Sequence, residues 1–443
     1  MVLRRLSSTE ALQSRNKNRK WPSVNRAGKE LLHPITKPFY SGKLRIEESD
    51  TIATFGSCFA ISILRSFPGC LNIIKLFENE NFQTTENSRV TYNVFSMLNQ
   101  LRWAYGLIDD DLAYSGVFQV RTDNIYGDYH GLYVISEKNS RISGNNKRNK
   151  IVASQRDQTS SNDLFPESDF STSELREWLY SDKDSVYNSC KLFNQRLKII
   201  RNANFFIFTL GMAEVWYDLE TNLYLNRMPP PLTLKTFPNR FEFRQLDYSD
   251  VLGALEEIYD VLKQMKGSNF KILVTVSPVP YETTFTPLDG AISANSYSKS
   301  VQRTAVESFV ANHENAAYFP AYEMAINSDN FLVWEADQHH VRQEFVNYIM
   351  SYFLESLGTD ALLNKVSEQG IRDVDIAMER LIELGNLVEK EKAQIEQNEY
   401  LNLKNLLKNV SPDPGGVQET ARLKEEIDLL TMKHRICHDL VKD

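Results

Sequence analysis

The sequence predicts an α/β protein built on a doubly wound parallel sheet. Three short apolar runs, residues 51–55, 205–210 and 271–276, are rich in β-branched and aromatic residues, as buried strands are. Stretches with helical periodicity separate these runs. Buried strands that alternate with helices form parallel sheets covered on both faces. In such sheets ligands bind beyond the carboxyl ends of the strands, so the residues after each run are the first candidates for a site.

The remaining elements follow the same alternation. Residues 1–45 have few periodic signals, whereas residues 112–137 alternate apolar and polar around glycines and predict hairpins. Further strands are expected at 72–77 and 317–320. Helices are expected at 95–105, 173–202, 248–266, 296–312 and 342–357.

The length of 443 residues and the shifts in composition predict three regions. A flexible N-terminal arm (1–34) precedes the main domain (35–362), which carries a polar insert at 137–169. A helical extension (363–443) follows. Its last helix has apolar positions spaced four and three residues apart, a seam for a short coiled coil. This seam predicts either a homo-oligomer formed through the C-terminal helices or packing on the main domain.

Composition excludes several functions. The formal net charge of −8 argues against a general nucleic-acid binder, and no phosphate-binding glycine loop is present. The four cysteines form no CxxC pair and no zinc spacing, which predicts a reducing, cytoplasmic compartment and no metal site. No apolar run reaches membrane-spanning length, and the N-terminus lacks the apolar core of a signal peptide.

The run at 51–55 leads into a turn that can present a nucleophile. Gly56 permits a sharp bend, and Ser57 then stands at the start of a helix, where free N–H groups stabilise negative charge. This is the geometry that a nucleophilic serine needs. Two alternatives remain: Ser57 is an ordinary N-cap, or Cys58 is the nucleophile as a thiolate, although a buried small side chain suits that cysteine better.

A serine nucleophile requires a base, and Asp337 and His340 provide the best pair. An aspartate three residues before a histidine can accept the imidazole Nδ1–H while the other nitrogen faces the nucleophile. The alternative is that Asp337 caps a helix and the histidines are solvated loop residues. His339 is assigned to the substrate side or to no function.

Together these motifs resemble the GSCFA family, which is placed with the SGNH (GDSL-like) hydrolases and acyltransferases. Gly56-Ser57-Cys58-Phe59-Ala60 reproduces the signature that names the family. The resemblance covers roughly residues 35–357, apart from the polar insert. It continues through Tyr92-Asn93, Thr209 to Trp216, Val274 to Pro280, Asn295 to Ser300, and Asp337 to Val341.

The resemblance implies a flavodoxin-like three-layer α/β/α sheet with a Ser-His-Asp triad. Ser57 would be the nucleophile, His340 the general base and Asp337 its orienting carboxylate. The related superfamily uses an Asn as an oxyanion donor where this chain has Ala213.

Five residues are candidates for oxyanion or substrate binding. Asn93 is expected to be either a replacement donor for the missing Asn or a turn residue. Glu214 is either a substrate contact or a residue that ends a strand. Trp216 is either a substrate contact or a buried indole of the core. Gly56 and Gly211 complete the set.

The expected function is a serine esterase or O-acyltransferase acting on an acyl ester, such as acetyl, of a glycan or glycan precursor. The expected partner is a glycan or an acylated small molecule. No cofactor is required, and acyl-CoA is a candidate acyl donor. The alternative is a non-catalytic binding or scaffold protein on the same fold.

Overall fold

The computed structural model describes the central part of the chain and short pieces outside it. The described residues are 3–13, 21–22, 31–32, 34–40, 42–56, 60, 71–74, 91–108, 118–121, 125–127, 193–229, 231–286, 290–335, 337–368, 379 and 382–383.

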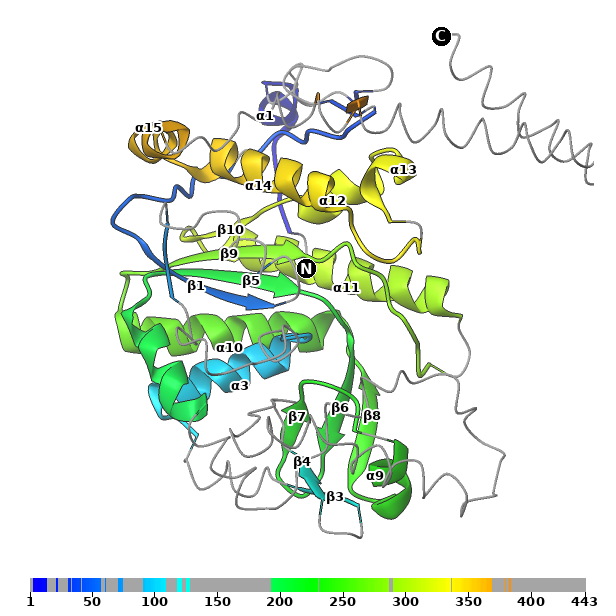
Figure 1. Cartoon of the computed structure of the whole chain (residues 1–443). Helices are drawn as coiled ribbons and strands as arrows, with labels where there is room; N and C mark the ends of the chain where they lie inside the picture. The colour runs from blue at the N-terminus through cyan, green and yellow to red at the C-terminus, as the bar shows by residue number, and fades with distance from the viewer. Residues whose placement is uncertain are drawn as a thin grey trace, which may run out of the picture.

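The centre of the molecule is a five-stranded parallel sheet in the order β10-β9-β5-β1-β2. Its strands are β1 (Thr51–Gly56), β2 (Asn72–Ile73), β5 (Phe205–Leu210), β9 (Lys271–Val276) and β10 (Ala316–Tyr318). In Figure 1 the arrows of β1 and β5 run from left to right, so the carboxyl ends of the strands lie at the right. The predicted α/β class is confirmed, and β5 and β9 have the predicted bounds.

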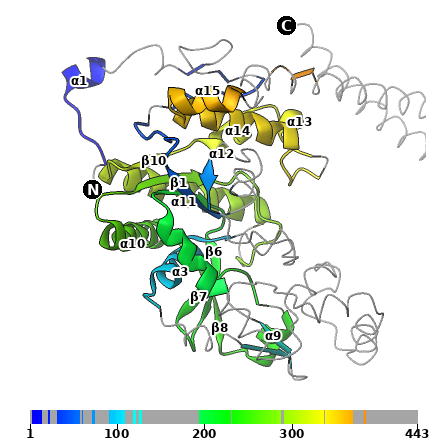
Figure 2. The same cartoon turned by 60° about the vertical axis from the view of Figure 1, so that its left-hand side comes forward.

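Helices cover both faces of the sheet, as the two views in Figures 1 and 2 show. One face carries α3 (Val94–Tyr105), α10 (Tyr248–Lys266) and α11 (Ala291–Asn312). The other face carries α12 (Ala321–Ile326), α13 (Asn330–Val333) and α14 (Gln343–Leu357). The result is the three-layer arrangement that the alternation of strands and helices predicts.

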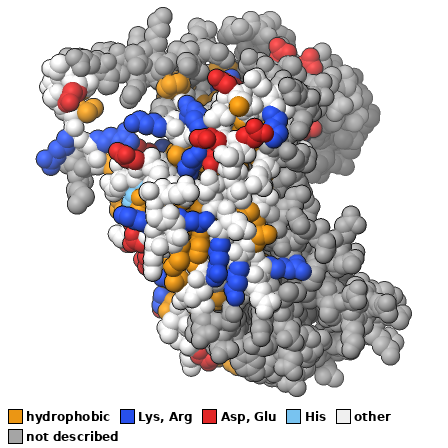
Figure 3. Space-filling view, turned by 90° about the vertical axis from the view of Figure 1, so that its left-hand side faces the viewer, with side chains coloured by type: hydrophobic (Ala, Val, Ile, Leu, Met, Phe, Trp, Pro, Cys, Tyr) orange, Lys and Arg blue, Asp and Glu red, His pale blue; other side chains and the backbone are white. Residues whose placement is uncertain are grey.

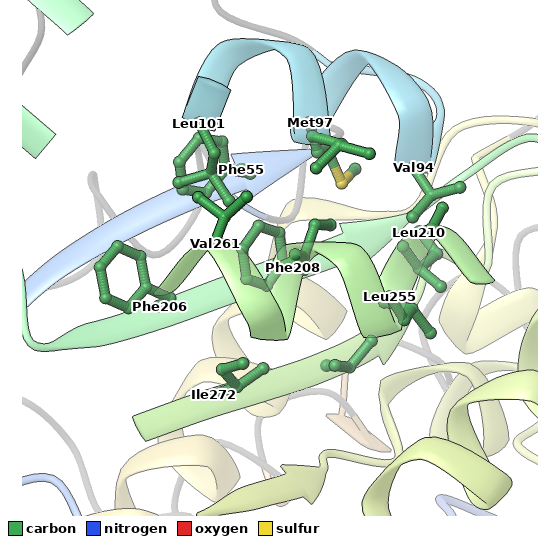
Figure 4. Close-up of a cluster of buried hydrophobic side chains, with 14 of the residues drawn as sticks. Phe55, Val94, Met97, Leu101, Phe206, Phe208, Leu210, Leu255, Val261 and Ile272 are labelled. Atoms are coloured by element: carbon green, nitrogen blue, oxygen red, sulfur yellow. The ribbon is translucent and has the colours of Figure 1, made fainter. Parts of the chain in front are cut away.

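Strand alternation divides the core between these faces. Phe206 and Phe208 of β5 point toward α3 and α10, whereas Phe205 and Ile207 point toward α14. Because successive side chains of a strand alternate sides, a run that is apolar at every position is buried on both faces. Figure 4 shows the α3–α10 side, where the Phe55 and Phe208 rings stack at 5.0 Å.

A second, antiparallel sheet in the order β7-β6-β8 follows the end of β5 and was not predicted. It comprises β6 (Glu214–Asp218), β7 (Leu223–Leu225) and β8 (Phe241–Gln245), with α9 (Pro231–Thr236) between β7 and β8. The Asp218 carboxylate is fully buried and accepts two hydrogen bonds from Arg240, at 2.8 and 3.0 Å. This paired charge holds the turn after β6 against β8.

Other predicted elements differ in extent. The hairpin expected within 112–137 is present as β3 (Phe118–Arg121) and β4 (Ile125–Gly127). Helix α11 begins at Ala291, five residues before the predicted start at 296. The expected helix at 173–202 is described only over 193–202, where it ends in a 3-10 turn, η4 (Lys198–Asn202).

The terminal regions are described only in part. In the predicted flexible arm, α1 (Ser8–Gln13) is helical, and Arg4 pairs with Glu307 of α11. The extension begins with α15 (Asp360–Glu368). The polar insert at 137–169 and the last helix lie outside the described residues, so their predicted roles stay predictions. Figure 3 shows the edge where the parallel strands begin, with Lys and Arg side chains beside apolar ones, opposite the carboxyl ends.

Candidate active site

The carboxyl end of β1 is shaped by a glycine that no other residue could replace without strain. Gly56 has φ of +130°, and a Cβ at this position would lie 2.5 Å from the Thr209 carbonyl oxygen. Both facts favour glycine. The carbonyl oxygen of Gly56 accepts a hydrogen bond from the Thr91 N–H at 3.0 Å. Ser57 and Cys58 come next in the chain and lie outside the described residues.

Asp337 and His340 form a hydrogen-bonded pair in the loop between α13 and α14, drawn in yellow at the right of Figure 1. The Oδ2 atom of Asp337 lies 2.6 Å from Nδ1 of His340. The other oxygen, Oδ1, accepts the backbone N–H groups of His339 and His340 at 2.9 and 3.0 Å. The sequence prediction that Asp337 contacts the imidazole is therefore met in the structure.

These hydrogen bonds determine the protonation of the pair. The His340 side chain, followed by the two backbone N–H groups, holds the pKa of Asp337 well below its usual range. An ionised carboxylate only accepts hydrogen bonds, so Nδ1 carries the hydrogen. In a neutral imidazole the lone pair is then on Nε2, which is the nitrogen that can accept a proton from a nucleophile.

The loop holding this pair has a defined conformation. Trp334 and Val341 form an antiparallel bridge, and the Glu335 N–H donates to the His340 carbonyl at 2.8 Å. Gln338 at the tip has φ of +56°. The His340 side chain is 70% exposed, so the imidazole is accessible to solvent and to a substrate.

The charges that shift the pKa of His339 indicate which residues lie near this loop. Burial lowers the pKa of His339, with further contributions from the charges of His340 and Lys299, while Glu282 opposes the change. Lys299 belongs to α11 and Glu282 to the segment after β9. The loop between α13 and α14 thus lies within electrostatic range of both, on the carboxyl side of the sheet.

Gly211, directly after β5, is enclosed by neighbouring backbone and by α11. A Cβ on Gly211 would lie 3.0 Å from the Tyr92 carbonyl oxygen. The Gly211 carbonyl accepts hydrogen bonds from Lys299 Nζ at 2.9 Å and from Gln302 Nε2 at 3.3 Å. The Met212 N–H of the same peptide group donates to Tyr92 O at 2.9 Å.

Asn93 is the N-cap of α3, with its side chain buried. Oδ1 accepts the Ser96 N–H at 2.9 Å, and Nδ2 donates to the Leu225 carbonyl at 3.0 Å. These contacts give Asn93 a structural function. The prediction that its amide donates to an oxyanion would require the second Nδ2 hydrogen and stays a prediction.

Glu214 and Trp216 lie at the start of β6, close to Gly211 in the chain. The buried Glu214 carboxylate accepts Thr284 Oγ1 at 2.6 Å, Thr286 Oγ1 at 2.9 Å and the Phe285 N–H at 3.0 Å. Both carboxylate oxygens therefore hold the 284–286 segment.

The Phe285 ring in that segment packs edge-on against partly buried Trp216, with ring centroids 5.6 Å apart. Phe243 of β8 completes this aromatic cluster, 5.8 Å from Trp216 and 5.9 Å from Phe285. Trp216 is thus both a core contact and part of a partly accessible aromatic surface. A role in substrate binding stays a prediction.

Sequence reasoning missed Lys299 and Gln302, although a signal was present. Both stand on the helical face of α11 that continues through the buried residues Ala305, Val306 and Phe309. A lysine and a glutamine on an apolar helical face depart from the pattern of a core-facing stripe, and that departure is the signal. Lys299 is 1% exposed, and burial lowers its pKa to about 7.

The described residues were searched for a group of metal ligands and for a membrane-spanning helix. Among them, no group of three or more His, Cys, Asp or Glu side chains could hold a metal ion. None of the helices searched there is long and apolar enough to span a membrane.

The fold and the Asp–His pair define an α/β protein with a candidate acid–base site at the carboxyl edge of its sheet. A family model described as the GSCFA family matches residues 51–353, which is more than half of the chain. The chain belongs to the GSCFA family. Searches of curated proteins and of solved structures found no significant match.

Proposed function

We propose that the protein is an SGNH-type serine esterase or O-acyltransferase in which Ser57, His340 and Asp337 act as a catalytic triad. The observation that carries the proposal is the 2.6 Å contact between Asp337 and Nδ1 of an exposed His340. It leaves Nε2 as the free base. Support for Ser57 comes from the chain itself, because it directly follows Gly56, whose positive φ turns the chain at the end of a central strand.

The reaction then follows from these groups. Ser57 Oγ attacks the acyl carbon while His340 Nε2 takes the hydroxyl proton, and Asp337 stabilises the resulting imidazolium. The ester C–O bond breaks, and the leaving oxygen receives the proton from His340. Water or a sugar hydroxyl then gives its proton to His340 and attacks the acyl carbon. The bond from that carbon to Ser57 Oγ breaks, and His340 returns the proton to Oγ. An acyl-CoA thioester would acylate Ser57 in the same way.

A glycan-type substrate is supported by the aromatic cluster of Trp216, Phe243 and Phe285. Aromatic faces pack against the apolar faces of sugar rings, and all three rings are partly exposed. The segment that carries Phe285 also carries Glu282, which influences His339 beside the proposed base. Glu282 thus relates the segment that carries Phe285 to the loop that carries Asp337 and His340.

The test is the hydrolysis of a short-chain aryl acetate by the wild type, by Ser57→Ala and by His340→Ala. Folding is verified by circular dichroism. We expect the wild-type rate to fall by at least about 10³-fold in each variant, as is typical for loss of a triad member. An unchanged rate in Ser57→Ala would refute the nucleophile. No activity in the wild type, even with acetyl-CoA and glycan acceptors supplied, would favour the non-catalytic binding protein.

A further inference from the structure

In the proposed reaction, the backbone N–H of Ser57 would donate a hydrogen bond to the oxyanion. This N–H belongs to the same peptide group as the Gly56 carbonyl. A peptide group is planar, so fixing the direction of its carbonyl also fixes the direction of its N–H. The Gly56 carbonyl oxygen is held by the Thr91 N–H at 3.0 Å. The 91–93 segment therefore holds the carbonyl of the peptide group that precedes Ser57.

The 91–93 segment is in turn held by the Gly211–Met212 peptide. The Met212 N–H donates to Tyr92 O at 2.9 Å. The carbonyl of the same peptide, on Gly211, receives Lys299 Nζ at 2.9 Å. A continuous series of contacts thus runs from α11 through the end of β5 to the end of β1.

Lys299 is an unexpected residue for this position. Lysine is almost never fully buried without a paired charge, because removing an ammonium group from water is costly. Lys299 is 1% exposed, and among the described residues no carboxylate lies within ion-pair distance of its Nζ. Proteins break such local rules mainly at functional sites.

We infer that Lys299 is a positioning residue, which secures the Gly211–Met212 peptide and, through Tyr92 and Thr91, the peptide that presents the Ser57 N–H to an oxyanion. This inference rests on the proposed function of Ser57. Both the ammonium and the neutral amine carry N–H donors, so the contact with Gly211 persists when Lys299 titrates.

Gln302 provides a matched control, because it stands one turn further along the same helix and reaches the same carbonyl. Its contact is longer, at 3.3 Å, and its Nε2 also donates to the carbonyl and hydroxyl oxygens of Ser298, at 3.1 and 2.9 Å. Lys299 is therefore the principal donor. Replacing either residue by methionine removes one donor from Gly211 and leaves an unbranched apolar side chain.

The experiment measures the rate at which a fluorophosphonate labels Ser57. In this reaction Ser57 Oγ bonds to phosphorus, fluoride leaves and His340 takes the serine proton, while the phosphoryl oxygen occupies the oxyanion position. We expect Lys299→Met to be labelled about 10-fold more slowly than the wild type and Gln302→Met within about 3-fold, because an indirect effect is smaller than loss of an oxyanion donor itself. With an aryl acetate, Lys299→Met should lower kcat and leave KM unchanged, which a general loosening of the fold would not do.

The outcomes separate the two proposals. Labelling of Ser57→Ala at the wild-type rate, or no labelling of the wild type, would overturn the proposed function and with it the role of Lys299. If Ser57→Ala abolishes labelling and Lys299→Met does not change its rate, the role of Lys299 alone is overturned. Equal slowing in Lys299→Met and Gln302→Met would also overturn it. If Lys299→Met does not fold, Lys299→Leu, which also lacks a donor, is measured with the same expectation.

Discussion

Replacing Lys299 by methionine should stabilise the protein, and the gain should depend on pH. Burial lowers the pKa of Lys299 from 10.5 to about 7. At about 1.4 kcal/mol per pH unit, that difference corresponds to an upper limit of about 5 kcal/mol of destabilisation below about pH 7, where Lys299 is protonated in both the folded and the unfolded chain. The lost hydrogen bond to Gly211 offsets about 1–2 kcal/mol of the gain. We expect Lys299→Met to gain about 3 kcal/mol near pH 6.

The sign of the pH dependence follows from proton binding. Between pH 7 and 10.5 the unfolded chain holds a proton on Lys299 that the folded chain has released. The free energy of unfolding of the wild type therefore rises with pH in this window, by up to about 1.4 kcal/mol per unit, relative to the variant. The advantage of Lys299→Met should vanish at about pH 9, where the remaining cost of burial equals the value of the lost hydrogen bond.

Urea unfolding of the wild type and of Lys299→Met at pH 6, 8 and 9.5 measures this difference. Lys263→Met, at an exposed position on α10, controls for the loss of one ammonium group from the surface. Its difference from the wild type should stay constant across this range. If the curves of Lys299→Met and the wild type run parallel from pH 6 to 9.5, the reasoning from burial is refuted.

Three further substitutions test separate parts of the structure. Asp337→Asn should lower kcat of the proposed esterase by about 10³- to 10⁴-fold without unfolding, because an amide can donate to Nδ1 and favour the wrong tautomer; aryl acetate kinetics measure this. Gly56→Ala should reduce the free energy of unfolding by at least about 2 kcal/mol, since its Cβ would meet the Thr209 carbonyl oxygen at 2.5 Å; a smaller loss in urea unfolding would contradict the strain. Arg240→Ala leaves the buried Asp218 charge unpaired and should cost about 3–5 kcal/mol, detected as faster amide exchange in β6 and β8.

The sequence predicts the central sheet well because its signals are local. The runs of β5 and β9 are apolar at most positions without alternating, as strands buried on both faces are. The β7-β6-β8 sheet was missed because its strands mix buried acids with aromatics. An aspartate such as Asp218 is typical of a turn. Its place in a strand depends on the ion pair with Arg240, which is 22 positions away in the sequence.

The candidate site also combines local contacts, which the sequence predicts, with long-range contacts, which it does not. Asp337 and His340 are three residues apart, so their pairing could be predicted from spacing alone. The contact of Lys299 with Gly211 spans 88 positions and depends on how α11 packs on the sheet. Asn93 was predicted as an oxyanion donor or a turn residue, and its cap of α3 also required the distant Leu225 carbonyl. Long-range polar contacts are the part of the site that local patterns do not encode.

The balance between hydrolysis and acyl transfer depends on acceptor binding more than on the proposed triad. The same base activates water or a sugar hydroxyl, and the His340 side chain is 70% exposed, so burial does not keep water from it. A transferase with so open a base must hold its acceptor long enough to compete with water. Trp216, Phe243 and Phe285 are the described residues placed to do so. Removing these rings would then slow transfer and leave hydrolysis of a small ester unchanged, whereas an esterase for small substrates would tolerate their loss.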